Sequence, residues 1–423
     1  MSRLLPKQGE HCLNILITGV GSTLGYGILE TIKQSGLKCQ VTGTDYLDTA
    51  VGLYQVDYPY ILPDIYQDPQ KEKVWLTAVQ KIISERKIKY VLVGLDFEVP
   101  LFAKHKACLE NKTDCKVIVS SAEVVGICND KWLTYCFLRD SGFNAPRSCL
   151  PDELDEFVKS TPFPWIVKPR EGSTSKGLFI INNIETLSHA LENCDNPIIQ
   201  EEVGDVEGEF TCGVVVASGR ILSSIPLRRK LKNGNTSVAY FNKSDEVDRY
   251  IRQVAEKLGP DGPINIQLRL TTNGPMVFEI NPRFSGTTPV RSSFGVNEVS
   301  ILIEYLETGM LSDKPLPKEG MVIRYTVDQF VSNNDLKMIY FSWDAATTGD
   351  PATSYNWYFG TTADDVSNLV SGFDGTAENS GITWGDTADT GWQTNTTYYW
   401  KVASINTAGI TESSVYSFTT GST

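Results

Sequence analysis

The sequence contains little histidine and has no ordered cysteine pattern. Only three histidines, His11, His105 and His189, occur in the 423 residues, and none lies in a recognisable motif. Histidine-based acid–base or triad chemistry is therefore not expected. The nine cysteines lie between Cys12 and Cys212 at irregular spacing and without a C-x-x-C pair. This pattern predicts reduced thiols rather than a zinc site or a disulfide framework.

Excess basic charge and long apolar runs are also missing. Lysine and arginine number 38 against 51 aspartates and glutamates, which gives a formal net charge of −13. Because nucleic-acid phosphates are bound by basic surfaces, a nucleic-acid partner is not expected. No apolar run approaches the ~20 residues that span a bilayer, and the first residues do not resemble a signal peptide. We therefore expect no membrane partner and a cytoplasmic location.

The composition changes sharply near residue 340. Residues 340–423 hold nine acidic residues and one basic residue, five of the eight tryptophans and no cysteine. Short alternating segments rich in Thr, Ser, Gly and Asn fill this part, which is typical of strands and turns. The chain length suits two or three domains. We predict an all-β sandwich over residues 340–423, after a different kind of fold.

Strand and helix patterns alternate before that boundary. Strand-like apolar runs occur at residues 14–18, 39–44, 90–94 and 116–120, and helix-like segments at 24–35 and 74–85. This order predicts a parallel sheet covered by helices, that is, an α/β domain over residues 1–122. A helix at 131–141 and short strands with hairpin turns then predict an α+β domain over 123–332.

A glycine-rich turn joins the first predicted strand to the first helix. Gly19, Gly21 and Gly25 follow the strand, and Asp45 ends the second strand. Such a turn suits a pyrophosphate at a helix N-terminus, and the acid suits a ribose. The spacing G-x-G-x-x-x-G nevertheless departs from the dinucleotide fingerprint. A structural turn and a nucleotide-binding turn both stay open at this point.

Two segments in the middle of the chain suit a nucleotide. Lys168 ends an apolar strand, and residues 172–177 read Gly-Ser-Thr-Ser-Lys-Gly. The backbone N–H groups of such a loop and the lysine charge suit a polyphosphate. A second apolar strand at residues 198–203 runs into acids, and Glu209 follows, so ribose hydroxyls could donate to carboxylates here. Taken alone, either segment is also compatible with a solvent-exposed turn.

The most informative pattern is a predicted β-hairpin with an Asn-Gly turn at residues 273–274. Glu279 and Asn281 lie two residues apart on its second strand and share a face, and Gln267 on the first strand can face them. Three oxygen ligands on one face suit Mg²⁺. Arg283 lies two residues further on, where it could stabilise charge on a transferring phosphoryl group.

With these motifs, residues 12 to 330 resemble the ATP-grasp superfamily and, within it, the carbamoyl phosphate synthase large-subunit branch of carboxylate–amine ligases. The resemblance is strongest at Phe278-Glu279-Ile-Asn281-Pro-Arg283. It implies a Rossmann-like pre-ATP-grasp domain over residues 1–122 and an ATP-grasp domain over residues 123–332. The implied cofactors are ATP and Mg²⁺ or Mn²⁺.

The resemblance also implies a role for individual residues. The implied metal ligands are Gln267, Glu279 and Asn281. The implied nucleotide-binding residues are Lys131, Lys168, Ser173, Ser175, Gly177, Glu201 or Glu202 as the hinge acid, Val203 and Glu209. Lys168 and Arg283 are the implied catalytic residues. We add Arg228, which with Arg229 lies on a basic strand and suits a phosphate or carboxylate; a solvated strand end fits equally well.

The implied reaction begins when ATP phosphorylates a carboxylate, and an amine or related nucleophile then displaces the phosphate. The expected partners are small-molecule carboxylate and amine substrates, with residues 285–289 lining the acceptor pocket, and a homodimer stays open. Two other functions also stay open. An NAD(P)-binding oxidoreductase would use the glycine turn but leaves the metal ligands unexplained, whereas a non-catalytic ATP-binding or scaffold protein would bind ATP without turnover.

Residues 340–423 resemble a fibronectin type III module. Trp343 lies in an early strand-like segment, and Tyr398, Trp400 and Val402 alternate along a later one, which indicates a half-buried strand. Tyr398 takes the place of the corner tyrosine of that family. The resemblance implies a binding or spacing module with a protein or glycan partner.

Overall fold

The computed structural model describes residues 12–172, 177–204, 208–311, 317–330, 354–362, 368–369, 396–406 and 409–419. The chain divides into two compact units. The first unit comprises Met1–Gln40 and Gln80–Val327, and the second comprises Val41–Val79 and Asp328–Thr423. The domain boundaries expected from the sequence stay predictions. Among the described residues, no helix is both long and apolar enough to cross a membrane.

The first unit begins with parallel strands and the helices that follow them. β1 (Leu13–Ile17) pairs with β4 (Tyr90–Leu92), which pairs in turn with β5 (Lys116–Ile118), all in parallel. α1 (Thr23–Ser35) follows β1, and α3 (Glu98–Lys112) follows β4. The predicted α/β pattern is thus confirmed for these elements. α3 was not predicted, because lysines and glutamates interrupt its apolar face.

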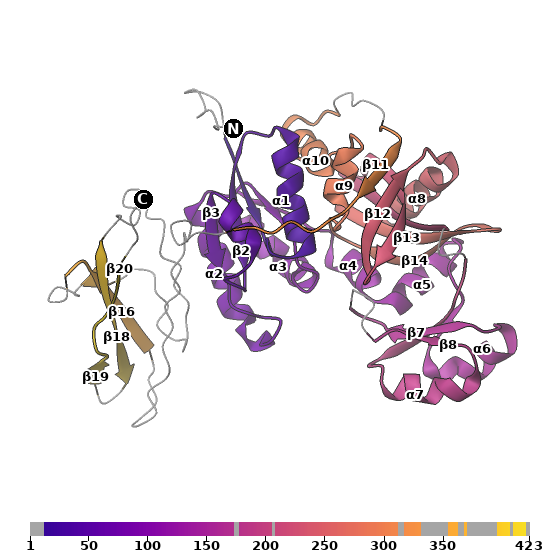
Figure 1. The fold of residues 1–423 in the computed structure, drawn as a ribbon, viewed down its shortest axis with the longest axis horizontal. Helices are drawn as coiled ribbons and strands as arrows, with labels where there is room; N and C mark the ends of the chain where they lie inside the picture. Colours follow the sequence, from indigo (N-terminus) through magenta and orange to yellow (C-terminus); the bar gives the residue numbers. More distant parts are fainter. Residues whose placement is uncertain are drawn as a thin grey trace. The chain divides into compact units, whose positions relative to one another are not determined.

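A six-stranded antiparallel sheet forms the centre of the first unit (Figure 1). Its spatial order is β14 (Gly274–Asn281), β13 (Gly262–Thr271), β10 (Glu209–Ala217), β11 (Arg220–Lys232), β12 (Asn235–Phe241) and β15 (Gly320–Ile323). Cys212 and Val214 of β10 pack with Val247, Ile251 and Val254 of α8 (Asp245–Leu258) in one apolar core. Because side chains alternate along a strand, the neighbouring residues of β10 point to the opposite face.

Four further helices flank this sheet. α4 (Ala122–Asn129) and α5 (Lys131–Asp140) join the same apolar core through residues such as Val124 and Leu138. α9 (Thr288–Ser293) and α10 (Glu298–Thr308) lie on the opposite face, since a Cβ at Gly213 of β10 would meet the carboxylate of Glu298. The predicted helix at 131–141 is confirmed by α5.

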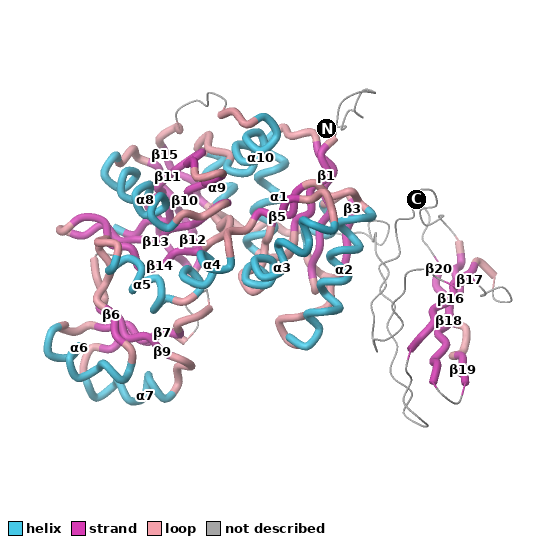
Figure 2. Tube along the Cα trace, turned by 180° about the vertical axis from the view of Figure 1, so that it is seen from behind, coloured by secondary structure: helices cyan, strands magenta, loops and turns pink. Residues whose placement is uncertain are grey.

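A smaller sheet lies beside the first. Its order is β6 (Ser148–Cys149), β9 (Pro197–Glu201), β7 (Trp165–Pro169) and β8 (Phe179–Ile181). Figure 2 shows α6 (Leu154–Ser160) and α7 (Leu187–Glu192) on one side of these strands. Trp165 is fully buried and its ring packs edge-on against Phe157 of α6, with the ring centroids 5.2 Å apart.

The predicted hairpin is confirmed as β13 and β14. Gln267 lies directly opposite Glu279, and Asn265 lies opposite Asn281. An irregularity in the register follows Gln267. Ile266 and Ile280 belong to the apolar core on the α8 side. The polar residues of the hairpin therefore lie on the face away from α8.

The glycine-rich turn has a steric explanation. Gly19 has a φ of +57°, in the left-handed region that favours glycine. A Cβ at Gly25 would lie 2.1 Å from the carbonyl oxygen of Gly19, and a Cβ at Gly94 would lie 2.6 Å from the Cα of Gly25. Close packing of β1, α1 and the end of β4 thus accounts for glycine at these positions without a bound dinucleotide.

The second unit contains two groups of described strands. β2 (Cys39–Asp45), which begins just before this unit, pairs in parallel with β3 (Tyr58–Ile61), and α2 (Glu72–Glu85) begins in the same segment. β16 (Ser354–Gly360), β17 (Asn368–Leu369), β18 (Thr397–Asn406), β19 (Gly409–Glu412) and β20 (Tyr416–Thr419) form one antiparallel sheet.

The described C-terminal strands agree with the expected β-structure. Tyr398 and Val402 of β18 are buried, whereas Trp400 is partly exposed and stacks on Tyr416. Trp343 lies outside the described residues. The two-sheet sandwich and the fibronectin-like identity stay predictions, since the described strands belong to a single sheet.

Candidate active site

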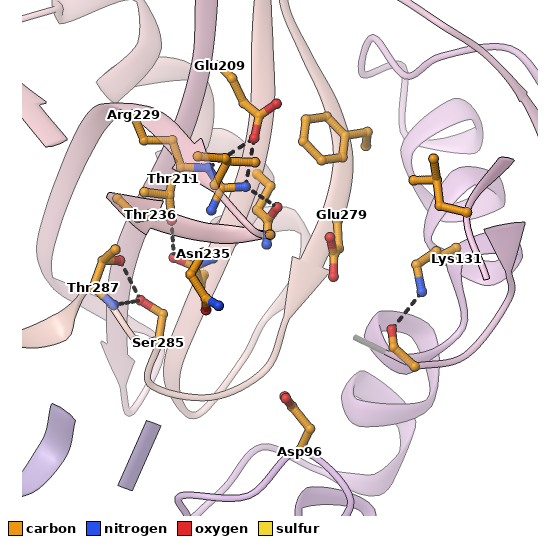
Figure 3. A pocket seen from close by; sticks show the side chains of 18 of the residues that line it. Asp96, Lys131, Glu209, Thr211, Arg229, Asn235, Thr236, Glu279, Ser285 and Thr287 are labelled. Atoms are coloured by element: carbon orange, nitrogen blue, oxygen red, sulfur yellow. Dashed lines mark hydrogen bonds and ion pairs between the residues drawn. The ribbon is translucent and has the colours of Figure 1, made fainter. Parts of the chain in front are cut away.

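A cavity of about 500 Å³ opens on the face of the six-stranded sheet away from α8 (Figure 3). β10, β13 and β14 contribute one wall, and β7 and β9 contribute another. The N-terminus of α1 and the segment after β4 also reach it, through Ser22 and Asp96. Every residue that lines the cavity belongs to the first unit.

Lys168 is a buried cation in the cavity wall. Its side chain is 8% exposed, and its Nζ donates to Oε1 of Gln200 at 2.8 Å. The ammonium also lies 5.8 Å from the ring centroid of Phe278. Burial is the main cause that lowers the pKa of Lys168 to about 8. The charges of Lys131 and Arg269 act in the same direction, and the carboxylate of Glu279 opposes them.

Lys131 is a second lysine that lines the cavity. It is the first residue of α5, and its Nζ donates to the carbonyl oxygen of Gly172 at 2.9 Å (Figure 3). Asp130 caps this helix by accepting from the backbone N–H of Trp132 at 2.8 Å, and it pairs with the guanidinium of Arg170. These contacts tie the helix N-terminus to the segment that follows β7.

The strand β9 ends in two acids with different surroundings. Glu201 lines the cavity, and its Oε1 accepts from the backbone N–H of Arg147 at 2.8 Å. Glu202 is not among the lining residues and forms an ion pair with Arg269. Arg269 also donates to the carbonyl oxygen of Val203 at 2.9 Å. Glu201 is therefore the acid of the two that lines the cavity.

A buried network joins Glu209 to Gln267. Arg229 donates to Oε1 of Glu209 through Nε at 3.0 Å and Nη2 at 2.8 Å. The same Nη2 lies 2.7 Å from Oε1 of Gln267 (Figure 3). Arg269 approaches the other oxygen of Glu209 at 3.4 Å. One guanidinium thus orients both the expected ribose acid and an expected metal ligand.

Glu279 projects into the open part of the cavity (Figure 3). Nδ2 of Asn281 donates to Oε1 of Glu279 at 3.2 Å, and Oδ1 of Asn281 accepts from Arg283 at 3.1 Å. Nε of Arg283 donates to Asp96 at 2.7 Å. This chain of contacts links the hairpin to the segment after β4.

The oxygen donors of the hairpin fit a hard divalent cation. Among the described residues, no group of three or more His, Cys, Asp or Glu side chains is placed to hold a metal ion. A cation at the hairpin would therefore bind the carboxylate of Glu279 with amide oxygens of Asn281 or Gln267 and with ligand oxygens. Mg²⁺ accepts such a partial set of protein ligands.

The structure brings most of the predicted site residues to one cavity. The predicted residues that line it are Lys131, Lys168, Glu201, Val203, Glu209, Gln267, Glu279 and Arg283. Those described but not lining it are Gly177, Glu202, Arg228 and Asn281. Ser173 and Ser175 lie outside the described residues. Arg228 has its guanidinium 4.5 Å from the ring centroid of Tyr240, whereas its neighbour Arg229 lines the cavity.

Four charged lining residues were not predicted, namely Asp96, Glu171, Arg269 and Arg324. Arg269 lies two residues after Gln267 on the same strand, so strand periodicity could have indicated it. Asp96 follows β4, and ligands often bind at the carboxyl ends of parallel strands. Arg324 has no such signal, because it comes after β15 in a segment without a recognised motif.

The sequence and the fold are similar to those of known enzymes. Residues 205–329 match a family described as ATP-grasp in the biosynthetic pathway with Ter operon. The carbamoyl phosphate synthase large chain of Helicobacter pylori is 25% identical over 324 residues, which cover 68% of this chain and 28% of that relative. The chain thus spans less than a third of the length of that relative.

Two solved structures share the fold. Biotin carboxylase of Campylobacter jejuni, in a β,γ-ATP complex, has a TM-score of 0.59 and 16% identity and covers 74% of each chain. The N5-carboxyaminoimidazole synthetase of Staphylococcus aureus, complexed with ADP, has a TM-score of 0.59 and 15% identity and covers 77% of this chain and 84% of its own. The chain therefore shares the mixed α/β fold of these two structures, and its residues 205–329 match the ATP-grasp family model.

Proposed function

We propose that this protein is an ATP- and Mg²⁺-dependent ligase that activates a carboxylate as an acyl phosphate for attack by an amine or related nucleophile. The observation that carries the proposal is the convergence of Lys168, Glu279 and Arg283 on one cavity. A phosphate-binding cation, a metal-binding carboxylate and a guanidinium are the groups that phosphoryl transfer requires. The nucleotides in the biotin carboxylase and synthetase structures support ATP as the ligand.

The proposed position of the nucleotide follows from two lysines and from the end of strand β9. Lys131 and Lys168 both line the cavity and would bind phosphate oxygens. Glu201 and Val203 line the cavity at the end of β9, where backbone groups suit an adenine edge. Glu209 would accept from ribose hydroxyls, and Arg229 holds it in a fixed orientation.

The proposed metal site is the hairpin face. Glu279 with Asn281 or Gln267 would hold Mg²⁺ or Mn²⁺, which supplies charge neutralisation at the phosphates when bound. The contacts of Asn281 with Glu279 and Arg283 orient these side chains before a ligand arrives. Such preorganisation lowers the reorganisation needed in the transition state.

The chemistry proceeds in two displacements. A carboxylate oxygen of the acid substrate attacks the γ-phosphorus of ATP, the bond to the β,γ-bridging oxygen breaks, and ADP leaves. Arg283 stabilises the negative charge on the transferring group, while Asp96 holds its guanidinium in place. The nucleophile then attacks the acyl carbon, and inorganic phosphate leaves. Positioning and charge neutralisation suffice, so no nucleophilic side chain is required.

A screen for ADP release tests the proposal. The protein is incubated with Mg²⁺ and ATP against pools of amino acids and small carboxylates, and ADP is measured. At least one pool is expected to raise ADP release above background, and Glu279→Gln is expected to lower that rate at least 100-fold. The absence of stimulation by every pool, or turnover that survives Glu279→Gln, would contradict the proposal.

A further inference from the structure

One end of the cavity is lined by residues to which we assign no role in binding the nucleotide or the metal ion. Figure 3 shows this end on the side of Glu279 that lies away from Lys131. Hydroxyl and amide groups line it together with one guanidinium, and the residues are Asn235, Thr236, Ser285, Thr287 and Arg324. Ser285 and Thr287 are almost fully buried, and their hydroxyls lie 2.7 Å apart. None of these five residues is acidic, and Glu209, which Figure 3 shows on the same side of Glu279, is paired with Arg229.

Arg324 lines this end, and no carboxylate of the described part of the chain pairs with it. It is the first residue after β15, and its backbone N–H donates to the carbonyl oxygen of Ser237 at 2.9 Å. Among the residues that the structure describes, its guanidinium donates only to the carbonyl oxygen of Thr236, at 3.5 Å. No acid among the described residues lies within 4.0 Å of it. The side chain of Arg324 is half-buried, and this burial lowers its pKa.

The other arginines that line the cavity are all neutralised. Arg283 pairs with Asp96 at 2.7 Å, and Arg229 pairs with Glu209 at 2.8 Å. Arg269 pairs with both Glu202 and Glu209. A partly buried guanidinium without a countercharge is costly. Among the arginines that line the cavity, Arg324 is therefore the one for which the described residues supply no carboxylate, so that a ligand anion could take that place.

We propose that Arg324 binds an anionic group, carboxylate or phosphate, that the acid substrate carries in addition to its reacting carboxylate. The inference rests on the proposed function, because it assigns ATP to the side of Lys168 and Glu279. A guanidinium can hold either anion through two parallel N–H···O bonds. The hydroxyls of Ser285 and Thr287 and the amide of Asn235 would orient the polar part of the same substrate. The substrate class is thus a small acid with at least two anionic groups.

Binding of small probes to the full chain tests this assignment. Saturation-transfer NMR measures the affinities of succinate, phosphonoacetate and acetate in the presence of Mg²⁺ and a non-hydrolysable ATP analogue. We expect the two dianionic probes to bind at least tenfold more tightly than acetate. Because a charge-assisted hydrogen bond contributes about 1.5–3 kcal/mol, Arg324→Ala should weaken them about 10- to 100-fold and leave acetate unchanged. A stronger preference for succinate indicates a carboxylate ligand, and one for phosphonoacetate indicates a phosphate ligand.

Two further variants make the result decisive. Arg220→Ala removes an exposed arginine of β11 and should leave all three affinities unchanged. Arg324→Gln can keep the hydrogen bond to Thr236 without the charge, so it replaces Arg324→Ala if that variant does not fold. Equal affinities for acetate and succinate, or a dianion preference that persists in both Arg324 variants, would overturn the inference. Calorimetry of the ATP analogue in the same samples reports separately on the proposed function.

Discussion

At the scale of single residues, Lys168 shows how burial changes the pKa of a side chain. The sequence predicts the position of this lysine but not its burial. The strand and loop pattern predicts a phosphate-binding lysine there. The structure adds that the side chain is buried and that its Nζ binds Gln200. Burial lowers the pKa of Lys168 to about 8, so the ammonium is present below pH 8 and is lost as the pH rises through that value.

Nucleotide affinity should follow this titration. We expect the affinity for Mg·ATP to fall about tenfold between pH 7 and pH 9, because the neutral amine no longer attracts phosphate. Calorimetric titration at a series of pH values measures the dissociation constant. Lys168→Arg is the control, since arginine stays charged over this range and should remove most of the dependence. An affinity that is flat in the wild type contradicts this role of Lys168.

Arg229 makes contacts between strands that the order of residues along each strand does not predict. Strand periodicity predicts that Gln267 and Glu279 share a face, and their register confirms it. It cannot predict that Arg229 binds both Gln267 and Glu209, because that contact depends on how β11, β10 and β13 align. Neighbouring Arg228 and Arg229 look alike in the sequence, yet only Arg229 lines the cavity.

At the scale of elements, the glycine turn is explained by packing. Gly94 after β4 lies against β1 and the start of α1, and a Cβ there would lie 2.1 Å from the carbonyl oxygen of Thr18. This contact favours the structural interpretation of the glycine pattern. The short distances between Gly94, Thr18 and Gly25 therefore do not support the alternative hypothesis that the turn binds the cofactor of an oxidoreductase.

Alanine substitutions test this packing. Gly94→Ala should lower the free energy of unfolding by about 2–3 kcal/mol, because backbone atoms have to move apart. Gly126→Ala in α4 is the matched control: nothing lies within 4 Å of its added Cβ, and alanine favours a helix by up to about 1 kcal/mol. Urea denaturation measures both values. Equal stabilities of the two variants would show that the close approach has no energetic effect.

The helices α9 and α10 carry a buried ion pair next to Asn265, a residue of the cavity wall. Arg291 and Glu298 are each 1% exposed, and their closest atoms lie 3.1 Å apart. Arg291 also donates to Asn265 of β13, which lines the cavity. The pair thus connects these helices to the strand that carries Gln267.

Breaking that pair should be strongly destabilising. Glu298→Gln should lower the free energy of unfolding by about 3–5 kcal/mol, since it leaves the buried guanidinium without its countercharge. The double variant Arg291→Met/Glu298→Gln should recover part of this loss. Lys33→Ala, which breaks the more exposed pair with Glu30, should cost less than about 1 kcal/mol. A loss below 1 kcal/mol for Glu298→Gln would refute this view of the pair.

At the scale of the whole molecule, the sequence predicts the elements better than their assembly. The βα alternation, the helix at 131–141 and the hairpin are confirmed, because each depends on local periodicity and turn residues. Contacts between distant segments were not predictable. The ion pair of Asp96 with Arg283 and the position of Arg324 in the cavity depend on long-range packing that no local pattern encodes.

Truncation tests whether the C-terminal residues contribute to ligand binding in the cavity. Every lining residue lies between Ser22 and Arg324. A chain shortened to residues 1–330 should therefore bind a non-hydrolysable ATP analogue with a dissociation constant within about twofold of the full chain. Circular dichroism checks that the shortened chain folds. A folded chain that no longer binds the analogue would show that residues 331–423 contribute to the site.

The central claim is the transfer of a phosphoryl group to a carboxylate, and isotope transfer tests it most directly. An acid that stimulates ADP release is labelled with ¹⁸O in its carboxylate, and the released phosphate is examined by ³¹P NMR. Attack of the carboxylate on the γ-phosphorus followed by displacement places one substrate oxygen in the phosphate. We predict one ¹⁸O atom in each phosphate released by turnover. Release of ADP with unlabelled phosphate would contradict the acyl-phosphate mechanism.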